Sequence, residues 1–150
     1  MAAQHPVHRQ AHAVVPVAHD HFLVLGSAGG LRSTANDLLT FLEAVLGYRG
    51  TPLAPAMEAM IRTRRPGGTP PPATSDRPGA TQVALGWNIY TDGSREIVWK
   101  NGSVSGFRAF MGYERATRLG VVALINAQTT AGADDIGLHL LDANIAVNLP

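Results

Sequence analysis

The sequence predicts an α+β fold in which helices pack on an antiparallel β-sheet of about three to four strands. Three features indicate this fold: a helical apolar period in the first half of the chain, two pairs of strand-like segments in the second half, and a final helix. At 150 residues the chain has the length of one domain, so residues 1–150 are treated as a single unit.

The first half is expected to hold an irregular arm and two helices. Residues 1–25 contain five histidines and no regular apolar period, which is typical of an irregular arm. Ser33 or Thr34 then offers a side-chain oxygen that can cap a helix. A second short helix is expected over residues 55–62. The inward face of the first helix is expected to hold Leu38, Phe41, Leu42, Val45 and Leu46.

A stretch rich in proline and glycine separates the two halves. Residues 64–79 hold five prolines and three glycines, and this composition sustains neither a helix nor an interior strand. We therefore predict a surface loop over residues 64–80.

Two β-hairpins are predicted in the second half. Residues 83–90 and 96–100 flank Asp92-Gly93, a dipeptide that favours a tight hairpin turn. Residues 107–113 and 119–125 form the second strand pair. The last of these segments is mostly an unbroken apolar run, which predicts a strand covered on both faces.

A C-terminal helix is predicted to follow the hairpins. Asp134 and Asp135 place negative charge where it stabilises the start of a helix. The inward face of this helix is expected to hold Ile136, Leu140, Leu141 and Ile145.

Composition argues against several classes of function. A net charge of +1 gives no field that attracts nucleic acid or an anionic membrane. The apolar runs are too short for a signal-peptide core or a membrane span, and the cellular compartment stays open. Without cysteine there is neither a disulfide nor a thiolate metal site. His5, His8 and His12 have the spacing of one helix face, but Pro6 favours a solvated arm over a metal site. We expect no metal and no cofactor.

One short segment carries the candidate chemistry. Lys100 is the only lysine among the 12 basic Lys and Arg residues, and it stands directly before Asn101-Gly102-Ser103. Unlike arginine, lysine offers a compact charge whose pKa shifts readily on burial. We expect the segment to present an ammonium, an amide and the backbone N–H of Ser103 to one point beside the sheet edge. The alternative is an ordinary lysine at a solvated strand end, beside a turn-forming Asn-Gly pair.

The run from Trp99 to Phe107 (WKNGSVSGF) resembles the Lys-Thr/Ser-Gly motif of penicillin-recognising serine enzymes, which lies on an edge strand. Three other segments are similar to the same family in the same order. Residues 28–38 resemble its glycine turn and helix start, residues 85–87 its pre-motif strand, and residues 110–126 the two strands that follow the motif. The chain thus resembles the C-terminal part of serine β-lactamases and penicillin-binding proteins, including class C β-lactamases, D-Ala-D-Ala carboxypeptidases and related esterases. The resemblance implies a partial β-lactamase/transpeptidase-like fold.

The resemblance also implies substrate-binding roles for four residues. Lys100 would help to bind a substrate carboxylate, and Gly102 would let the substrate lie close to the strand. The backbone N–H of Ser103 would be one of two donors to the oxyanion of the reaction. Asn101 stands where the family has threonine or serine, and its amide can both donate and accept hydrogen bonds.

Two other motifs of the family are absent from these 150 residues. The nucleophile motif Ser-x-x-Lys can end only at Lys100, and the residue three positions earlier is Ile97. No tyrosine or serine is followed two positions later by asparagine, as the motif Tyr-x-Asn or Ser-x-Asn requires. Removal of the nucleophile from a serine hydrolase costs on the order of a millionfold in turnover.

We therefore expect a β-lactamase-related serine hydrolase chain that acts by acyl transfer on β-lactam, ester or D-alanyl peptide substrates. It is expected to be a C-terminal fragment that holds no catalytic residue and is inactive alone. The alternative function is a non-catalytic binding or interaction domain that uses the same sheet edge.

The resemblance predicts a partner at the other edge of the sheet. In the family, the strand equivalent to residues 119–125 pairs with a strand from the N-terminal segment. An apolar, unpaired edge invites another chain, so we expect either a homo-oligomer or pairing with a separately made N-terminal half.

Overall fold

The computed structural model describes residues 26–68, 79–93, 95–104, 106–127 and 132–147. No helix in these ranges is long and apolar enough to cross a membrane. The helical elements are a 3₁₀ turn (Gly26–Ala28), α1 (Ala35–Val45), α2 (Ala54–Arg62) and α3 (Ala133–Leu141). The strands are β1 (Arg65–Pro66), β2 (Ala80–Val83), β3 (Asn88–Asp92), β4 (Arg95–Val104), β5 (Phe107–Glu114) and β6 (Leu119–Ile125).

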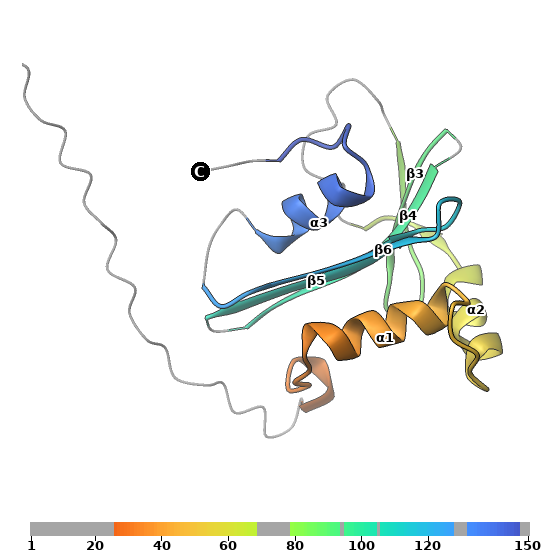
Figure 1. Cartoon of the computed structure of the whole chain (residues 1–150). Helices are drawn as coiled ribbons and strands as arrows, with labels where there is room; N and C mark the ends of the chain where they lie inside the picture. The colour runs from red at the N-terminus through yellow and green to blue at the C-terminus, as the bar shows by residue number, and fades with distance from the viewer. Residues whose placement is uncertain (1–25, 69–78, 94, 105, 128–131, 148–150) are drawn as a thin grey trace, which may run out of the picture.

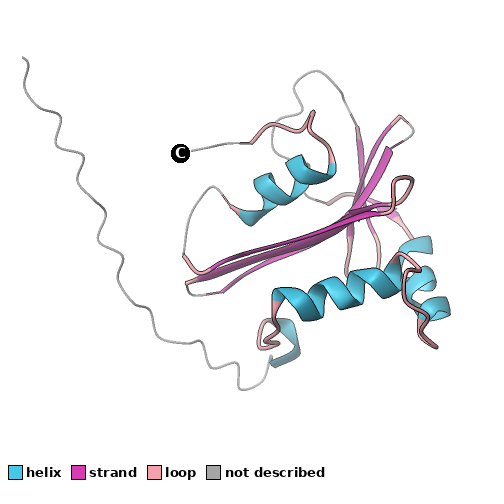
Figure 2. Cartoon of the chain, in the orientation of Figure 1, coloured by secondary structure: helices cyan, strands magenta, loops and turns pink. Residues whose placement is uncertain are grey.

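The strands form one antiparallel sheet in the order β1-β2-β3-β4-β5-β6. Helices α1 and α2 cover one face, and α3 covers the other (Figures 1 and 2). The predicted α+β class is confirmed. The expected strand number of about three to four is too low, because six strands are present in the described part of the chain.

Helix α1 forms where the sequence predicts it, and Thr34 is its N-cap. The Thr34 hydroxyl oxygen accepts a hydrogen bond from the Asp37 N–H at 3.2 Å, and the Asp37 carboxylate accepts one from the Thr34 N–H at 3.3 Å. This reciprocal pair is a capping box. Leu42 on the inward face is 1% exposed. The helix ends before Gly47, whose φ of 75° terminates helices at little cost.

Helix α2 also matches its prediction, but the segment after it matches only in part. Arg65–Pro66 pairs with β2, and β2 begins at residue 80, so the predicted loop over 64–80 contains strand residues at both ends. Proline is tolerated in β1 because this strand is at the edge of the sheet. Residues 69–78 of the loop and the predicted arm over 1–25 lie outside the described residues.

The predicted strand over residues 83–90 is wrong. Strand β2 ends at Val83 and β3 begins at Asn88, so the segment covers the end of one strand and the start of the next. The chain reverses between them with Gly86 at a φ of 80°, a backbone region that favours glycine. This turn lacks the Asn-Gly or Asp-Gly pair that marks a tight hairpin in sequence.

Two predicted hairpins are present, β3–β4 and β5–β6, although the first strand of the β3–β4 hairpin begins later than predicted. Strands β3 and β4 turn at Gly93, which has a φ of 57°. Strands β5 and β6 pair in a regular register that ends with Glu114 opposite Leu119. Both α1 and α3 contact β6, so a helix packs on each face of this strand as expected, although Leu119 and Leu124 stay partly exposed.

A buried carboxylate fixes the turn between β5 and β6. Glu114 is 2% exposed and accepts hydrogen bonds from the Ala116 N–H at 2.9 Å, the Thr117 N–H at 2.7 Å and the Thr117 hydroxyl at 2.6 Å. Burial acts to raise the pKa of Glu114, but these hydrogen bonds outweigh it and lower the pKa. The carboxylate is therefore ionised at neutral pH.

Helix α3 packs through a different face from the one predicted. Ile136 is 43% exposed and Leu140 is 57% exposed. A Cβ on Gly137 would lie 2.1 Å from the ring of Phe110. The helix backbone therefore rests directly on this ring, and the side of the helix that carries Gly137 faces the sheet. The buried residues of the helix are Ala133, Asp135, Gly137, Leu138 and Leu141.

The sheet separates two hydrophobic clusters. The cluster under α3 contains Tyr90, Ile97, Trp99, Phe110, Ala133, Leu138, Leu141 and Ile145. Leu141 and Ile145 are buried as predicted, but Ile145 lies beyond the end of the helix and not on it. The cluster under α1 and α2 contains Leu42, Ile61, Trp87, Ile89, Val98 and Tyr113. Because side chains alternate along a strand, β4 contributes odd-numbered residues to the first cluster and Val98 to the second.

Candidate functional site

The candidate segment, residues 100–103, lies in the second half of β4. Toward β5 it is paired at every position. On its other side β3 reaches only as far as Trp99, which lies opposite Asn88. No other strand in the described part of the chain pairs with residues 100–104 on that side. Strand β4 is therefore an interior strand as far as Trp99 and an edge strand from Lys100 onward.

The backbone of the segment points partly toward this open side. The Arg115 N–H donates to the Glu96 carbonyl at 3.4 Å, so these opposed residues form a hydrogen-bonded pair. Hydrogen-bonded pairs alternate along an antiparallel ladder. Even-numbered residues of β4 therefore bond toward β5, and the N–H groups of Asn101 and Ser103 point to the open edge. This is the direction that an oxyanion donor at Ser103 requires.

The structure separates the side chains of Lys100 and Asn101. Lys100 and Gly102 share the face of Val98, where α1 and α2 pack, whereas Asn101 and Ser103 share the α3 face. Lys100 is exposed and makes no hydrogen bond or ion pair with the described residues. The expected convergence of the ammonium and the Asn101 side-chain amide at one point is therefore wrong, because adjacent strand residues face opposite sides of the sheet.

The Asn101 side chain is instead fixed by α3. Its Nδ2 donates to Oδ2 of Asp134 at 2.5 Å. Burial raises the pKa of Asp134, while the hydrogen bond from Asn101 and the charge of Arg108 act against this rise. The contact ties the first turn of α3 to the middle of the candidate segment.

Asp134 was expected only as a residue that stabilises the start of α3. Its contact with Asn101 joins residues that are 33 positions apart, and no local pattern in the sequence indicates it. The one available signal is that Asn101 replaces a hydroxyl residue, which suggests a changed partner for this side chain. The histidines considered for a metal site, His5, His8 and His12, lie outside the described residues.

Comparison with known proteins gave one match. A family model described as Beta-lactamase matches residues 1–144. No curated protein and no solved structure matched the chain significantly.

Proposed function

This chain belongs to the beta-lactamase family, and we propose that it supplies the substrate-binding strand of a serine hydrolase that transfers acyl groups from β-lactam, ester or D-alanyl peptide substrates. The residues proposed to bind substrate are Lys100, Asn101, Gly102 and Ser103. No catalytic residue is assigned in this sequence, and the reaction as proposed uses no cofactor and no metal.

The open edge of β4 is the observation that supports this proposal. Among the strands that the structure describes, only β5 pairs with residues 100–104, so an extended substrate can add to the free side of β4 through main-chain hydrogen bonds. The backbone of Asn101 and Ser103 points to this side. At Gly102 an added Cβ would meet nothing within 4 Å, so the surface beside the strand is open to a ligand.

Two groups of the segment, the Ser103 N–H and the Lys100 ammonium, have a defined part in the proposed reaction. A serine hydroxyl of the separate N-terminal segment attacks the acyl carbon and gives up its proton to a base of that segment, which leaves a tetrahedral intermediate whose oxygen carries negative charge. The Ser103 N–H donates to that oxygen, and loss of one such donor typically lowers kcat by about 10²–10³-fold. The Lys100 ammonium, which no described carboxylate neutralises, attracts a carboxylate of the substrate.

The same proposal predicts that the 150-residue chain binds substrate but does not turn it over. The nucleophile motif Ser-x-x-Lys and the motif Tyr-x-Asn are both missing from its sequence. A pure sample is expected to leave a chromogenic cephalosporin and a short-chain ester intact. Steady turnover of either compound would contradict the proposal.

A reconstitution experiment tests the catalytic reading against the binding-domain alternative. The genomic DNA immediately upstream is read for an in-frame segment that encodes Ser-x-x-Lys and Tyr-x-Asn, and that segment is expressed and mixed with the chain. Hydrolysis that appears only in the mixture supports the hydrolase. Stable ligand binding with no turnover in the mixture supports a non-catalytic binding domain on the same edge.

A matched pair of glycine variants tests the site within that mixture. A Cβ at Gly102 or at Gly50 meets nothing within 4 Å, so both alanine variants are expected to fold equally well. Gly102→Ala places a methyl group beside the substrate and is expected to lower kcat/KM, whereas Gly50→Ala is not. Equal kcat/KM for the two variants would exclude a substrate at this strand.

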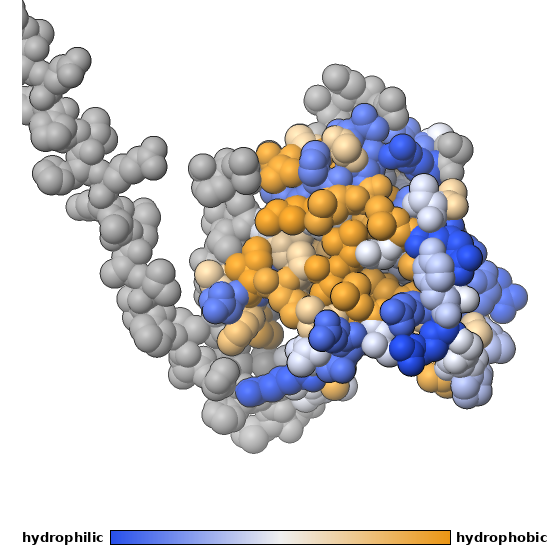
Figure 3. All heavy atoms as spheres, viewed as in Figure 1, coloured by the Kyte–Doolittle hydropathy of each residue, from blue (hydrophilic) through white to orange (hydrophobic). Residues whose placement is uncertain are grey.

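The partner prediction concerns the opposite edge of the sheet. Strand β6 is the last strand of the described sheet, and its Leu119 and Leu124 are 44% and 45% exposed. Figure 3 shows apolar residues gathered on the face of the molecule where β6 lies between α1 and α3. We propose that this edge pairs with a second copy of the chain or with an N-terminal half. A dilute monomer by light scattering, unchanged on mixing with that half, would contradict this.

A further inference from the structure

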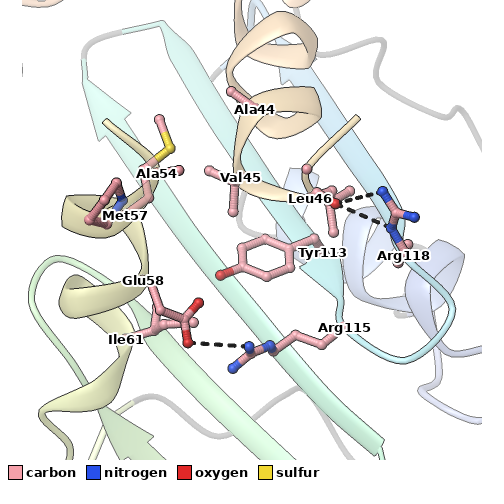
Figure 4. Close-up of a pocket in the computed structure, with 12 residues that line it drawn as sticks. Ala44, Val45, Leu46, Ala54, Met57, Glu58, Ile61, Tyr113, Arg115 and Arg118 are labelled. Carbon is pink, nitrogen blue, oxygen red and sulfur yellow. Dashed lines mark hydrogen bonds and ion pairs between the residues drawn. The ribbon is translucent and has the colours of Figure 1, made fainter. Parts of the chain in front are cut away.

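A cleft of about 500 Å³ lies at the opposite end of α1 from the capping box at Thr34. It is formed by the C-terminal end of α1, the first turns of α2 and the end of β5 (Figure 4). This volume is in the range of roughly 300–1,000 Å³ that is typical of small-molecule sites. None of the residues proposed to bind substrate on β4 lines it.

Tyr113 lies at the floor of the cleft, and its hydroxyl is a polar group there. Tyr113 is 2% exposed, and its hydroxyl points toward α2 between Val45 and Glu58 (Figure 4). Burial raises the pKa of Tyr113 to about 12, so the phenol is neutral at physiological pH and can donate a hydrogen bond. A ligand oxygen in the cleft can accept this hydrogen bond.

The charged groups of the cleft favour an anion. Arg115 and Arg118 against the single acid Glu58 give the lining a net charge of +1 (two positive charges and one negative). Arg115 lies 3.5 Å from Glu58 and 3.6 Å from Glu96, and its side chain is 41% exposed. The guanidinium therefore bridges two carboxylates, and its exposed side lies within reach of a ligand at the rim.

The start of α2 adds to the preference of the cleft for an anion. The helix has no side-chain cap and no acidic residue in its first turn. The dipole at a helix N-terminus favours negative charge. The N–H groups contribute less here, because the Ala54 N–H donates to the Thr51 carbonyl at 3.2 Å and Pro55 has no N–H.

The remaining walls of the cleft are apolar. Val45 and Leu46 come from the α1 side, and Met57 and Ile61 from α2. Arg118 holds the α1 side in place, because its Nε and Nη2 donate to the Leu46 carbonyl at 3.2 and 2.9 Å. A ligand that matches these walls needs an apolar body as well as a negative group.

We propose that this cleft binds a small carboxylate with an aliphatic body, its carboxylate between the Tyr113 hydroxyl and the Arg115 guanidinium and its aliphatic part against Val45 and Ile61. The site is separate from the proposed substrate strand, so the two proposals can fail independently.

The experiment titrates the full 150-residue chain with hexanoate and follows the methyl resonances of Val45 and Ile61 by NMR. Hexanol has the same chain without the charge and serves as the matched ligand. Hexanoate is expected to bind at least about tenfold more tightly than hexanol. Equal affinities, or no saturable shift with hexanoate, would overturn the proposal.

Three variants locate the site. Tyr113→Phe removes one oxygen and keeps the ring that packs edge-on against Trp87 at 5.8 Å, so the fold is expected to persist. Tyr113→Phe and Arg115→Gln are each expected to weaken hexanoate about tenfold or more while leaving hexanol unchanged. Arg62→Gln makes the same charge change on α2 outside the cleft and is expected to have no effect. Unchanged hexanoate affinity in both Tyr113→Phe and Arg115→Gln would also overturn the proposal.

Discussion

Replacing Gly137 by alanine tests the packing that places α3 on the sheet. A Cβ at this position would lie 2.1, 2.3 and 2.7 Å from three atoms of the Phe110 ring. Carbon atoms pack best at about 3.5–4.0 Å, so the helix and the ring must separate by about 1.5 Å. The ring cannot easily give way, because Phe110 is 1% exposed and stacks on Trp99 at a centroid distance of 6.0 Å.

The expected change in stability is the difference between two opposed effects. Overpacking a core typically costs about 1–3 kcal/mol, whereas alanine in place of a helical glycine gains about 0.5–1 kcal/mol. The expected net loss for Gly137→Ala is about 1–2 kcal/mol. In a domain of this size such a loss lowers Tm by roughly 2–8 °C. Displacement of α3 is also expected to pull Asp134 away from Asn101, because their hydrogen bond connects the same helix to β4.

Chemical denaturation followed by circular dichroism measures the loss of stability. NMR shifts of the Asn101 side-chain amide report the separation from Asp134. Gly102→Ala is the control, because its new Cβ meets nothing within 4 Å and its stability should stay close to that of the original chain. A Gly137→Ala chain as stable as the original, with an unchanged Asn101 amide, would refute the packing argument.

Two further predictions concern a buried carboxylate and a partly buried ion pair. Glu114→Gln is expected to destabilise the chain by about 1–3 kcal/mol, because a neutral amide cannot accept all the hydrogen bonds from the turn at Thr117. Glu43→Gln, at an exposed position, is the control and should change the denaturation midpoint little. Equal shifts of the midpoint in the two variants would contradict the prediction. Arg64 donates two hydrogen bonds to Glu96, and these lower the pKa of the Glu96 carboxylate. The pair therefore stabilises the fold fully above the ordinary carboxyl pKa of about 4.3. This stabilisation is lost as the pH falls through the lowered pKa of Glu96. Arg64→Met is therefore expected to lower the free energy of unfolding by about 1–2 kcal/mol at pH 7, and by progressively less in acid. Urea denaturation that shows the same loss of stability at pH 7 and in acid would contradict this prediction.

Local signals in the sequence were sufficient for much of the fold. The capping box at Thr34, the Asp92-Gly93 turn and the apolar run in β6 each act within a few residues, and all three predicted their elements correctly. The weak turn around Gly86 was missed because it carries no comparable local signal. Successive side chains of a strand point to opposite faces, so the sequence alone already implied that Lys100 and Asn101 are separated. The prediction that the two side chains converge overlooked this alternation.

By itself the sequence determined the order of the three helices and of the strands from β3 to β6, and the segment of β4 that carries the candidate chemistry, because propensity, capping and turn formation are short-range effects. Only the tertiary structure decided that β3 stops opposite Trp99 and leaves the following residues as an open edge. It also decided that Gly137 turns α3 onto Phe110 and that Asp134 holds Asn101. These features depend on contacts between segments far apart in the chain, which form only when the sheet and its helices pack together.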